Sequence, residues 1–210
     1  MTKAKIHIVN HPFVTDSLAH LRDKNTKLKK FRFHSDQICN FLFAEAIRGL
    51  EFKACEIETP IQATGVQKLK DEVVVVPVLR SGIAMLFGAM HLLPKSKIGF
   101  VGLERNEKTA VAREYYWKLP KLTQNSVVIV TDPMLATGGS ILHVLDHIAE
   151  ETTKAMRVVC VVAAPEGIKV VQTKYPEVEI FTAAIDERLN TIKYIVPGLG
   201  DYGDRYFGTE

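Results

Sequence analysis

Residues 127–142 read Val-Val-Ile-Val-Thr-Asp-Pro-Met-Leu-Ala-Thr-Gly-Gly-Ser-Ile-Leu. The four β-branched residues at 127–130 indicate a strand that is buried on both faces, as strands of parallel sheets are. Asp132 and Pro133 end this run, and from Ser140 onward the apolar residues recur at helical spacing. The stretch therefore predicts a buried strand, a short glycine loop and a helix in succession.

The glycine loop has the features of an anion-binding site. Gly138 and Gly139 let the backbone approach a ligand closely. The first N–H groups of the following helix would point at one spot, where the helix dipole favours negative charge. Thr137 and Ser140 add hydroxyl donors, although a Gly-Gly pair alone is also compatible with a tight turn that binds nothing. Asp132 would repel a phosphate but would accept hydrogen bonds from ribose hydroxyls, so the stretch favours a sugar phosphate as ligand.

The run 132–140 resembles the loop that binds phosphoribosyl pyrophosphate (PRPP) in type I phosphoribosyltransferases. Its form, Asp-Pro-Met-Leu-Ala-Thr-Gly-Gly-Ser, is similar to that of the uracil phosphoribosyltransferase family in particular. It lacks the Gly-Lys-Ser/Thr of a P-loop and the glycine spacing of a dinucleotide site. Three further stretches occur in the order expected for that family: 77–82, the segment around Arg105, and 197–209. The resemblance therefore covers nearly the whole chain.

Length and composition indicate an ordinary globular protein. The 210 residues are 47% hydrophobic and 24% charged, with a net charge of +3, and we expect a single domain, 1–210. The near balance of charge gives no reason to expect a nucleic-acid or membrane partner. Three widely spaced cysteines fit neither a disulfide framework nor a zinc site. We interpret them as buried thiols in a reducing compartment and expect a cytoplasmic protein.

The alternation of strand and helix patterns predicts an α/β fold. Besides the central stretch, apolar strand patterns occur at 73–79, 98–103, 157–163 and 178–185, with helical patterns between most of them. Such alternation is typical of a mostly parallel twisted sheet that is flanked by helices. Residues of about 50–70 indicate a projecting β-arm, and members of the resembled family form dimers through such an arm. We therefore expect a homodimer or a higher homo-oligomer.

Two short patterns on the predicted helices have alternative interpretations. Ser35 is a residue type that begins helices, so we expect it to cap a helix with Ile38 and Leu42 on its apolar face. His143 and His147 lie four residues apart on the helix after the glycine loop, a spacing that can bind a metal. No third ligand is evident in the sequence, and we therefore predict no metal held by the protein itself.

Arg80 and Arg105 are the predicted contacts to the pyrophosphate. Arg80 follows the strand at 73–79, and ligands of open α/β sheets bind beyond the carboxyl ends of the strands; a surface arginine is the alternative. The charged and aromatic segment of about 104–118 suits a mobile flap over the site, or else a solvated loop. The resemblance implies that both arginines contact pyrophosphate. Ser81, Glu104 and Lys108 depart from the residues that the family more often has.

The C-terminal segment, about 194–209, has a composition unlike a loose tail. It contains four glycines, a proline and several aromatic residues, which we expect to exclude a helix or a central strand. Its Pro-Gly-Leu-Gly-Asp and Phe-Gly-Thr strings resemble the uracil-binding hood of the family. The resemblance implies that backbone groups of Ile195, Gly200 and Tyr202 bind the base and that Asp201 lies beside PRPP. Tyr202 is often a smaller residue in the family, which predicts an altered depth of the pocket.

The resemblance implies a uracil phosphoribosyltransferase, which converts uracil and PRPP to UMP and pyrophosphate, with Mg²⁺ carried by PRPP. It leaves open activation by GTP. The implied catalytic residues are Asp132, Arg80 and Arg105. The implied PRPP-binding residues are Arg80, Arg105, Asp132, Pro133, Met134, Leu135, Ala136, Thr137, Gly138, Gly139, Ser140 and Asp201. The implied uracil-binding residues are Ile195, Gly200, Asp201 and Tyr202.

Two alternative functions stay open at this point. The first is a phosphoribosyltransferase for another base, against which the 197–209 segment argues. The second is a non-catalytic protein that senses PRPP or UMP. A nucleic-acid-binding sensor of that kind should have a basic face and degenerate catalytic loops, and this sequence indicates neither.

Overall fold

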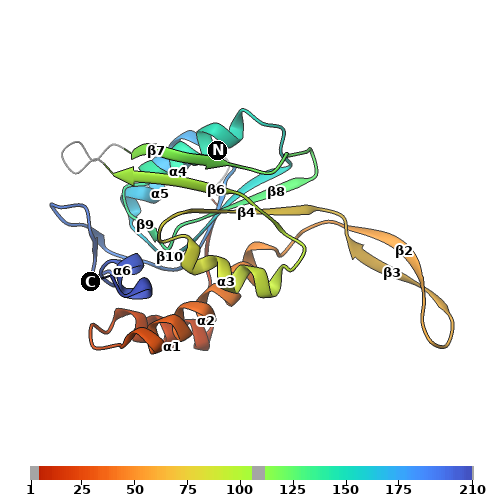
Figure 1. The fold of residues 1–210 in the computed structure, drawn as a ribbon, viewed down its shortest axis with the longest axis horizontal. Helices are drawn as coiled ribbons and strands as arrows, with labels where there is room; N and C mark the ends of the chain where they lie inside the picture. The colour runs from red at the N-terminus through yellow and green to blue at the C-terminus, as the bar shows by residue number, and fades with distance from the viewer. Residues whose placement is uncertain (1–4, 106–111, 210) are drawn as a thin grey trace.

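Strands β4 (Glu72–Leu79) and β8 (Ser126–Thr131) lie side by side at the centre of the main sheet, with Val76 opposite Val130. This computed structural model describes residues 5–105 and 112–209. In that part of the chain the strand order is β1-β11-β10-β8-β4-β6-β7 (Figure 1). The bounds of the other five are β1 (Ile6–Ile8), β6 (Phe100–Arg105), β7 (Ala112–Lys118), β10 (Ala155–Ala163) and β11 (Glu179–Ile185).

The sheet is parallel except at one edge. Short strand β5 (Lys97–Ile98) pairs with β4, and β9 (Met134–Leu135) pairs with β10, both in parallel. Only β6 and β7 pair in antiparallel fashion among the described strands of this sheet, as a hairpin. The predicted mostly parallel α/β fold is confirmed.

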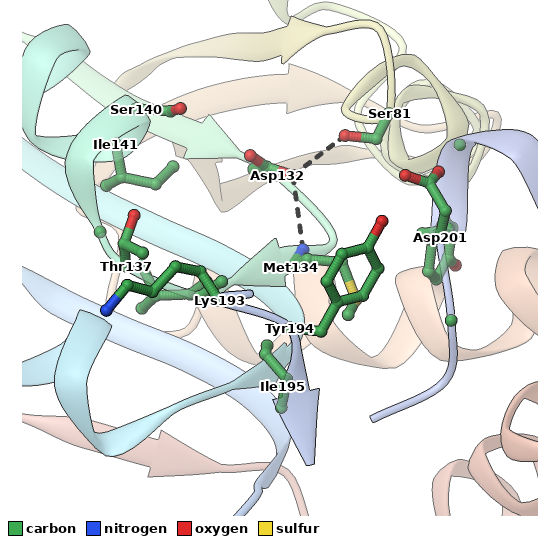
Figure 2. Close-up of a pocket in the computed structure, with 16 residues that line it drawn as sticks. Ser81, Asp132, Met134, Thr137, Ser140, Ile141, Lys193, Tyr194, Ile195 and Asp201 are labelled. Atoms are coloured by element: carbon green, nitrogen blue, oxygen red, sulfur yellow. Dashed lines mark hydrogen bonds between the residues drawn. The ribbon is translucent and has the colours of Figure 1, made fainter. Parts of the chain in front are cut away.

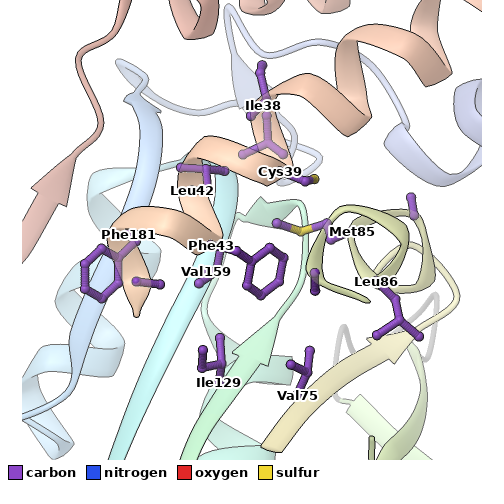
Figure 3. Close-up of a cluster of buried hydrophobic side chains, with 14 of the residues drawn as sticks. Ile38, Cys39, Leu42, Phe43, Val75, Met85, Leu86, Ile129, Val159 and Phe181 are labelled. Carbon is purple, nitrogen blue, oxygen red and sulfur yellow. The ribbon is translucent and has the colours of Figure 1, made fainter. Parts of the chain in front are cut away.

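Helices cover both faces of the sheet because successive side chains of a strand point to opposite faces. On one face, Val75 and Ile129 pack under α2 (Leu28–Ala46) and α3 (Ile83–Leu92), as Figure 3 shows. On the other face, Val74 and Val128 belong to a second core with α4 (Gly139–Ala149) and α5 (Pro165–Lys174). Helix α1 (Pro12–Arg22) packs on α2. Among the described helices, none is long and apolar enough to cross a bilayer.

The prediction that Ser35 caps the second helix was wrong. Helix α2 begins seven residues earlier, at Leu28, and its buried residues Phe31, Ser35, Ile38 and Leu42 continue one helical face. Because the intervening lysines point to solvent, the amphipathic pattern extends through the lysine-rich stretch. Ser35 is fully buried on one face of α2. Its hydroxyl oxygen accepts a hydrogen bond from Tyr202 of the C-terminal segment.

A two-stranded arm projects from the body of the molecule (Figure 1). Its strands β2 (Phe52–Glu58) and β3 (Ala63–Leu69) pair in antiparallel fashion and are largely exposed. The arm lies within the residues predicted for it. Because the arm is exposed, few residues of the same chain pack against it.

The C-terminal segment does contain a helix, contrary to the prediction. Strands β12 (Arg188–Leu189) and β13 (Ile195–Val196) form a small antiparallel pair, and α6 (Tyr202–Phe207) follows. Asp201 caps α6 by accepting the N–H of Asp204 at 2.9 Å, and Gly208 ends it with φ of 74°. Most of the glycines therefore lie at turns and helix ends, which leaves a short helix between them.

Candidate active site

A cavity of about 360 Å³ opens where the carboxyl ends of β4 and β8 meet. From β4 the chain continues through α3 to β6 on one side, and from β8 through α4 to β10 on the other. Ligands of open α/β sheets bind at such a switch point. The loops after the two strands and the C-terminal segment all line the cavity (Figure 2). The lining residues are Ser81, Asp132, Met134, Leu135, Ala136, Thr137, Gly138, Ser140, Ile141, Lys193, Tyr194, Ile195, Gly200, Asp201, Tyr202 and Gly203.

The glycine loop delivers the start of α4 to this cavity. Gly138 is the residue before the helix and has φ of 80°, a conformation that favours glycine. A Cβ at this position would also lie 2.8 Å from the carbonyl oxygen of Gly167 at the start of α5. The first N–H groups of a helix have no partner within the helix, so this end of α4 offers donors and a positive dipole end to an anion.

Asp132 lies at the other end of the same loop and is held by two donors. The Ser81 hydroxyl donates to its Oδ1 at 3.1 Å and the Met134 N–H at 3.4 Å (Figure 2). Burial raises the pKa of Asp132 to about 6, an effect that the two hydrogen bonds oppose and the nearby Asp201 carboxylate reinforces. A carboxyl group with such a pKa is a functional-site candidate because its ionisation falls near the working pH.

Arg80 lies at the mouth of the site rather than among its lining residues. Its guanidinium is 61% exposed and lies 3.0 Å from Oδ1 of Asp204 on α6. Hydrogen bonds from Thr209 and then Arg80 hold the pKa of Asp204 below its usual range. The loop that carries Arg80 packs closely on β8, because a Cβ at Gly82 would lie 2.6 Å from the Thr131 carbonyl oxygen. Arg80 thus connects the loop after β4 to the C-terminal segment.

Arg105 is the last residue of β6, on the β6–β7 hairpin. Residues 106–111 of the predicted flap, including Lys108, lie outside the described residues, and the side chain of Arg105 does too. Glu104 and Arg113 face each other across the hairpin at 3.7 Å. The structure thus places the strands of the flap at the edge of the sheet beyond β4.

The predicted uracil-binding residues Ile195, Gly200, Asp201 and Tyr202 all line the cavity. The ring of Tyr202 is only 1% exposed, and its hydroxyl donates to Oγ of Ser35 on α2 at 2.6 Å. The Tyr202 ring therefore fills the space between the C-terminal segment and α2. The predicted change in pocket depth stays a prediction.

Two arginines fix the C-terminal segment to the first helices. Arg22 of α1 forms a two-bond ion pair with buried Asp186, at 2.9 and 2.5 Å, and donates to the Gly198 carbonyl at 2.8 Å. Arg205 of α6 donates to the backbone carbonyls of Leu21 and Asp23. Bidentate and carbonyl-capping contacts of arginine hold a fixed geometry. The segment is thus a hood over the cavity, anchored to α1 and the turn that follows it.

The cavity brings together most, but not all, of the predicted site residues. Pro133, Gly139 and Arg80 are not among its lining residues, and the side chain of Arg105 lies outside the described residues. The lining residues that we did not predict are Ser81, Ile141, Lys193, Tyr194 and Gly203. Four of these five are sequence neighbours of predicted residues, and the cation of Lys193 would have been a signal for an anionic ligand.

Comparisons with known proteins agree with this geometry. A family model for uracil phosphoribosyltransferase matches residues 8–209. The chain belongs to the uracil phosphoribosyltransferase family. The uracil phosphoribosyltransferase of Shouchella clausii is 44% identical over 207 residues, 98% of this chain and 99% of the relative. That of Ureaplasma parvum is 44% identical over 204 residues, 97% of this chain and 99% of the relative.

Solved structures extend the same result. The AQ2163 protein of Aquifex aeolicus matches with a TM-score of 0.93 at 37% identity, covering 98% of this chain and 99% of that one. A hypoxanthine-guanine phosphoribosyltransferase from Bacillus anthracis, 14% identical with a TM-score of 0.51 over 76% of this chain and 80% of that one, shows a shared fold alone. The predicted family and the predicted enzyme class, a phosphoribosyl-transferring transferase, are confirmed.

Proposed function

We propose that the chain transfers the phosphoribosyl group of PRPP to N1 of uracil, forming UMP and releasing pyrophosphate. The observation that carries this proposal is one cavity in which the α4 N-terminus, the Asp132 carboxylate and the hood lie together. An anion site, an acceptor for ribose hydroxyls and a base pocket are the three parts that this reaction needs. The family's pyrimidine-salvage role would follow from the same reaction.

Different residues would bind the 5′-phosphate and the hydroxyls of the ribose. The start of α4 would hold the 5′-phosphate, with the hydroxyls of Thr137 and Ser140 and the cation of Lys193 in the same cavity. Asp132 would accept hydrogen bonds from the ribose hydroxyls. The bond from C1 to the pyrophosphate oxygen breaks while the bond from C1 to N1 forms. The electron pair of the broken bond leaves with the pyrophosphate, and the N1 proton passes to solvent. An ionised Asp132 nearby favours the positive charge that builds on the ribose.

Arg80 and Arg105 would stabilise the negative charge that develops on the pyrophosphate. Arg80 would exchange its present partner, the Asp204 carboxylate, for pyrophosphate oxygens. The carboxylates of Asp132 and Asp201 give the cavity the oxygen ligands that Mg²⁺ prefers. The pocket therefore fits PRPP that carries Mg²⁺, which supplies further charge neutralisation to the leaving group.

Backbone groups of Ile195, Gly200 and Tyr202 would select the base. Uracil offers an acceptor at O4 and a donor at N3, whereas cytosine offers the reverse. Fixed backbone partners reject cytosine because each buried group left unpaired costs about 1–3 kcal/mol. The arginine anchors of the hood support this role, since selectivity by backbone groups needs a rigid loop.

Assembly and location are part of the proposal. Phe52 and Leu69 pair across the arm and are 58% and 48% exposed, so a second copy that packs on the arm would bury both. The prediction of buried thiols is correct for Cys39 and Cys160 but wrong for Cys55, which is half-buried on the arm. The two buried free thiols support a reducing, cytoplasmic location. GTP activation stays an expectation from the family resemblance alone.

Formation of UMP from uracil and PRPP with Mg²⁺, followed by chromatography, tests the proposal. We expect Arg80→Ala and Arg105→Ala to raise the KM for PRPP by about tenfold or more, because each variant loses a charge-assisted contact to the pyrophosphate. Arg48→Ala is the matched control, because that arginine is 78% exposed and pairs only locally with Glu45 on α2 among its described partners. Absence of UMP from the wild-type reaction would contradict the proposal, and unchanged kinetics of an arginine variant would remove that arginine from the mechanism.

A further inference from the structure

Strand β7 of the β6–β7 hairpin packs on α4, outside the cavity (Figure 1). Side chains of types that can ligate a metal ion lie close together at this contact. His143 and His147 lie one turn apart on α4, and Glu114 on β7 supplies the third group that the sequence pattern lacked. One ligand atom from each of the three lies within 4.8 Å of the others. We propose that Glu114, His143 and His147 form a binding site for a divalent transition-metal ion of the zinc class.

The distances suit a tetrahedral ion. Oε2 of Glu114 lies 2.9 Å from Nε2 of His143 and 3.9 Å from Nε2 of His147. Zinc bonds of about 2.0–2.1 Å in a tetrahedral site place neighbouring ligand atoms about 3.3 Å apart. The two distances bracket this value, so side-chain shifts of about 0.4 and 0.6 Å would bring both histidine nitrogens to that separation from the carboxylate oxygen. A site of two histidines and one glutamate is a known zinc ligand set, with water as the fourth ligand.

The hydrogen bonds already orient one histidine for a metal. Nδ1 of His147 lies 3.1 Å from the backbone carbonyl oxygen of His143. A carbonyl oxygen only accepts, so Nδ1 is the donor of this hydrogen bond, and Nε2 is the nitrogen that can ligate an ion on the side of Glu114. Histidines that ligate metals almost always donate their second N–H to a carbonyl or carboxylate in this way. His143 would give up its Nε2 proton, or shift it to Nδ1, when the metal binds.

Ring geometry separates this cluster from a second one, which is formed by side chains of α1 and α2 and includes the buried His34. The rings of His143 and His147 are inclined at 63°, so their in-plane lone pairs can converge on one point. In the other cluster, Asp16 with His20 and His34, the two rings stack at 4.0 Å with an angle of 19°. In-plane lone pairs of stacked rings run parallel rather than converge. The α4 cluster is therefore the better metal site.

The site is open to an ion and has an internal reporter. The side chains of His143, His147 and Glu114 are 31%, 42% and 32% exposed. The ring of Trp117 lies 4.6 Å from that of His147, and it is the only tryptophan of the chain. A metal on His147 would thus tie β7 to α4, and it would also alter the emission of Trp117. The inference does not depend on the proposed reaction.

Titration of the full-length protein with Co²⁺, monitored by Trp117 fluorescence, tests the site. We expect saturable quenching at one equivalent per chain, reversal by Zn²⁺, and a rise in the thermal midpoint when Zn²⁺ is added. His147→Gln should abolish the quenching, and Glu114→Gln should weaken Co²⁺ binding by about tenfold or more. His91→Gln, at an exposed histidine on α3, is the matched control and should behave as wild type.

Wild-type emission that does not respond to excess Co²⁺ would overturn the proposal. Quenching of equal size and affinity in His147→Gln would overturn it as well, because the ion would then bind elsewhere. If His147→Gln does not fold, Glu114→Gln tests the proposal, because Glu114 lies on an exposed strand. An unchanged affinity of Glu114→Gln for Co²⁺ would also contradict the proposed site.

Discussion

At the scale of single residues, Asp132 determines how activity should depend on pH. Its carboxyl must be ionised to accept ribose hydroxyls, and burial raises its pKa to about 6. We therefore expect kcat/KM for PRPP to rise with pH through an acid limb near pH 6 and to level off above it. Asp132→Asn should lower kcat by about 10²-fold and remove that limb, whereas ionisation of PRPP itself would persist in the variant.

A substitution at Ser81 tests whether the acid limb arises from Asp132. The Ser81 hydroxyl donates to ionised Asp132 and so lowers the pKa of that carboxyl. Ser81→Ala should therefore move the acid limb to higher pH, by about 0.5–1 unit for a hydrogen bond of ordinary strength. Ser140→Ala, in the phosphate loop, should raise the KM for PRPP without moving the limb. If the acid limb does not move in Ser81→Ala, it does not arise from the ionisation of Asp132.

The same carboxyl should cost stability at neutral pH. Its pKa is raised in the folded chain, from 3.8 to about 6, so below pH 3.8 the group is protonated in both states and imposes no penalty. The penalty grows as pH rises through this window and is complete above pH 6. Asp132→Asn should therefore raise the free energy of unfolding by about 1–3 kcal/mol at pH 7. Urea denaturation should show this gain vanishing toward pH 4, and a gain independent of pH would contradict the mechanism.

At the scale of elements, the junction between β9 and α4 depends on one glycine. Gly138→Ala places a Cβ at a φ of 80° and 2.8 Å from the Gly167 carbonyl oxygen. We expect a loss of about 1–3 kcal/mol in the free energy of unfolding and a higher KM for PRPP, because the start of α4 must shift. Gly139→Ala is the matched control, since its Cβ would meet only Thr137 Oγ1, at 3.8 Å. Equal destabilisation of the two variants would argue against a conformational requirement at Gly138.

The elements also show how far the sequence predicts the structure. The β8 strand, the glycine loop and α4 were predictable because strong β-branched and helical patterns flank a glycine pair. Helix α2 was placed too late because lysines hid its first turn, and α6 was missed because its composition suggested only turns. Both errors concern residues whose conformation depends on distant partners, such as Ser35 with Tyr202. Ser81 adjoins the predicted Arg80, and the charge of Lys193 is a signal for an anion. The sequence still does not place the two side chains in one cavity, because only the fold brings their loops together.

At the scale of the whole molecule, the hood and α2 should behave as one unit. Tyr202 and Ser35 are 167 positions apart and share a buried hydrogen bond of 2.6 Å. Tyr202→Phe should cost about 1–2 kcal/mol in the free energy of unfolding and raise the KM for uracil, because Ser35 loses its partner and the hood loosens. Tyr206→Phe is the control, since its hydroxyl makes only a 3.4 Å contact with Asp36.

A double-mutant cycle measures that connection directly. Tyr202→Phe combined with Ser35→Ala should cost less than the sum of the single variants, because the second substitution removes a group that is already unpaired. Strict additivity would mean that the two side chains do not cooperate, and the hood would then be held by its other contacts, among them those of Arg22 and Arg205.

The central claim, one cavity that joins a PRPP site to a uracil pocket, is tested most directly by pyrophosphate release. The purified protein would be given PRPP and Mg²⁺ with uracil, cytosine, hypoxanthine, adenine or orotate in turn. We predict release with uracil and with none of the other bases. Release with a different base would keep the PRPP site but contradict the role of residues 195–202. Binding of PRPP or UMP without release for any base, even with GTP added, would contradict the enzyme and favour a sensor.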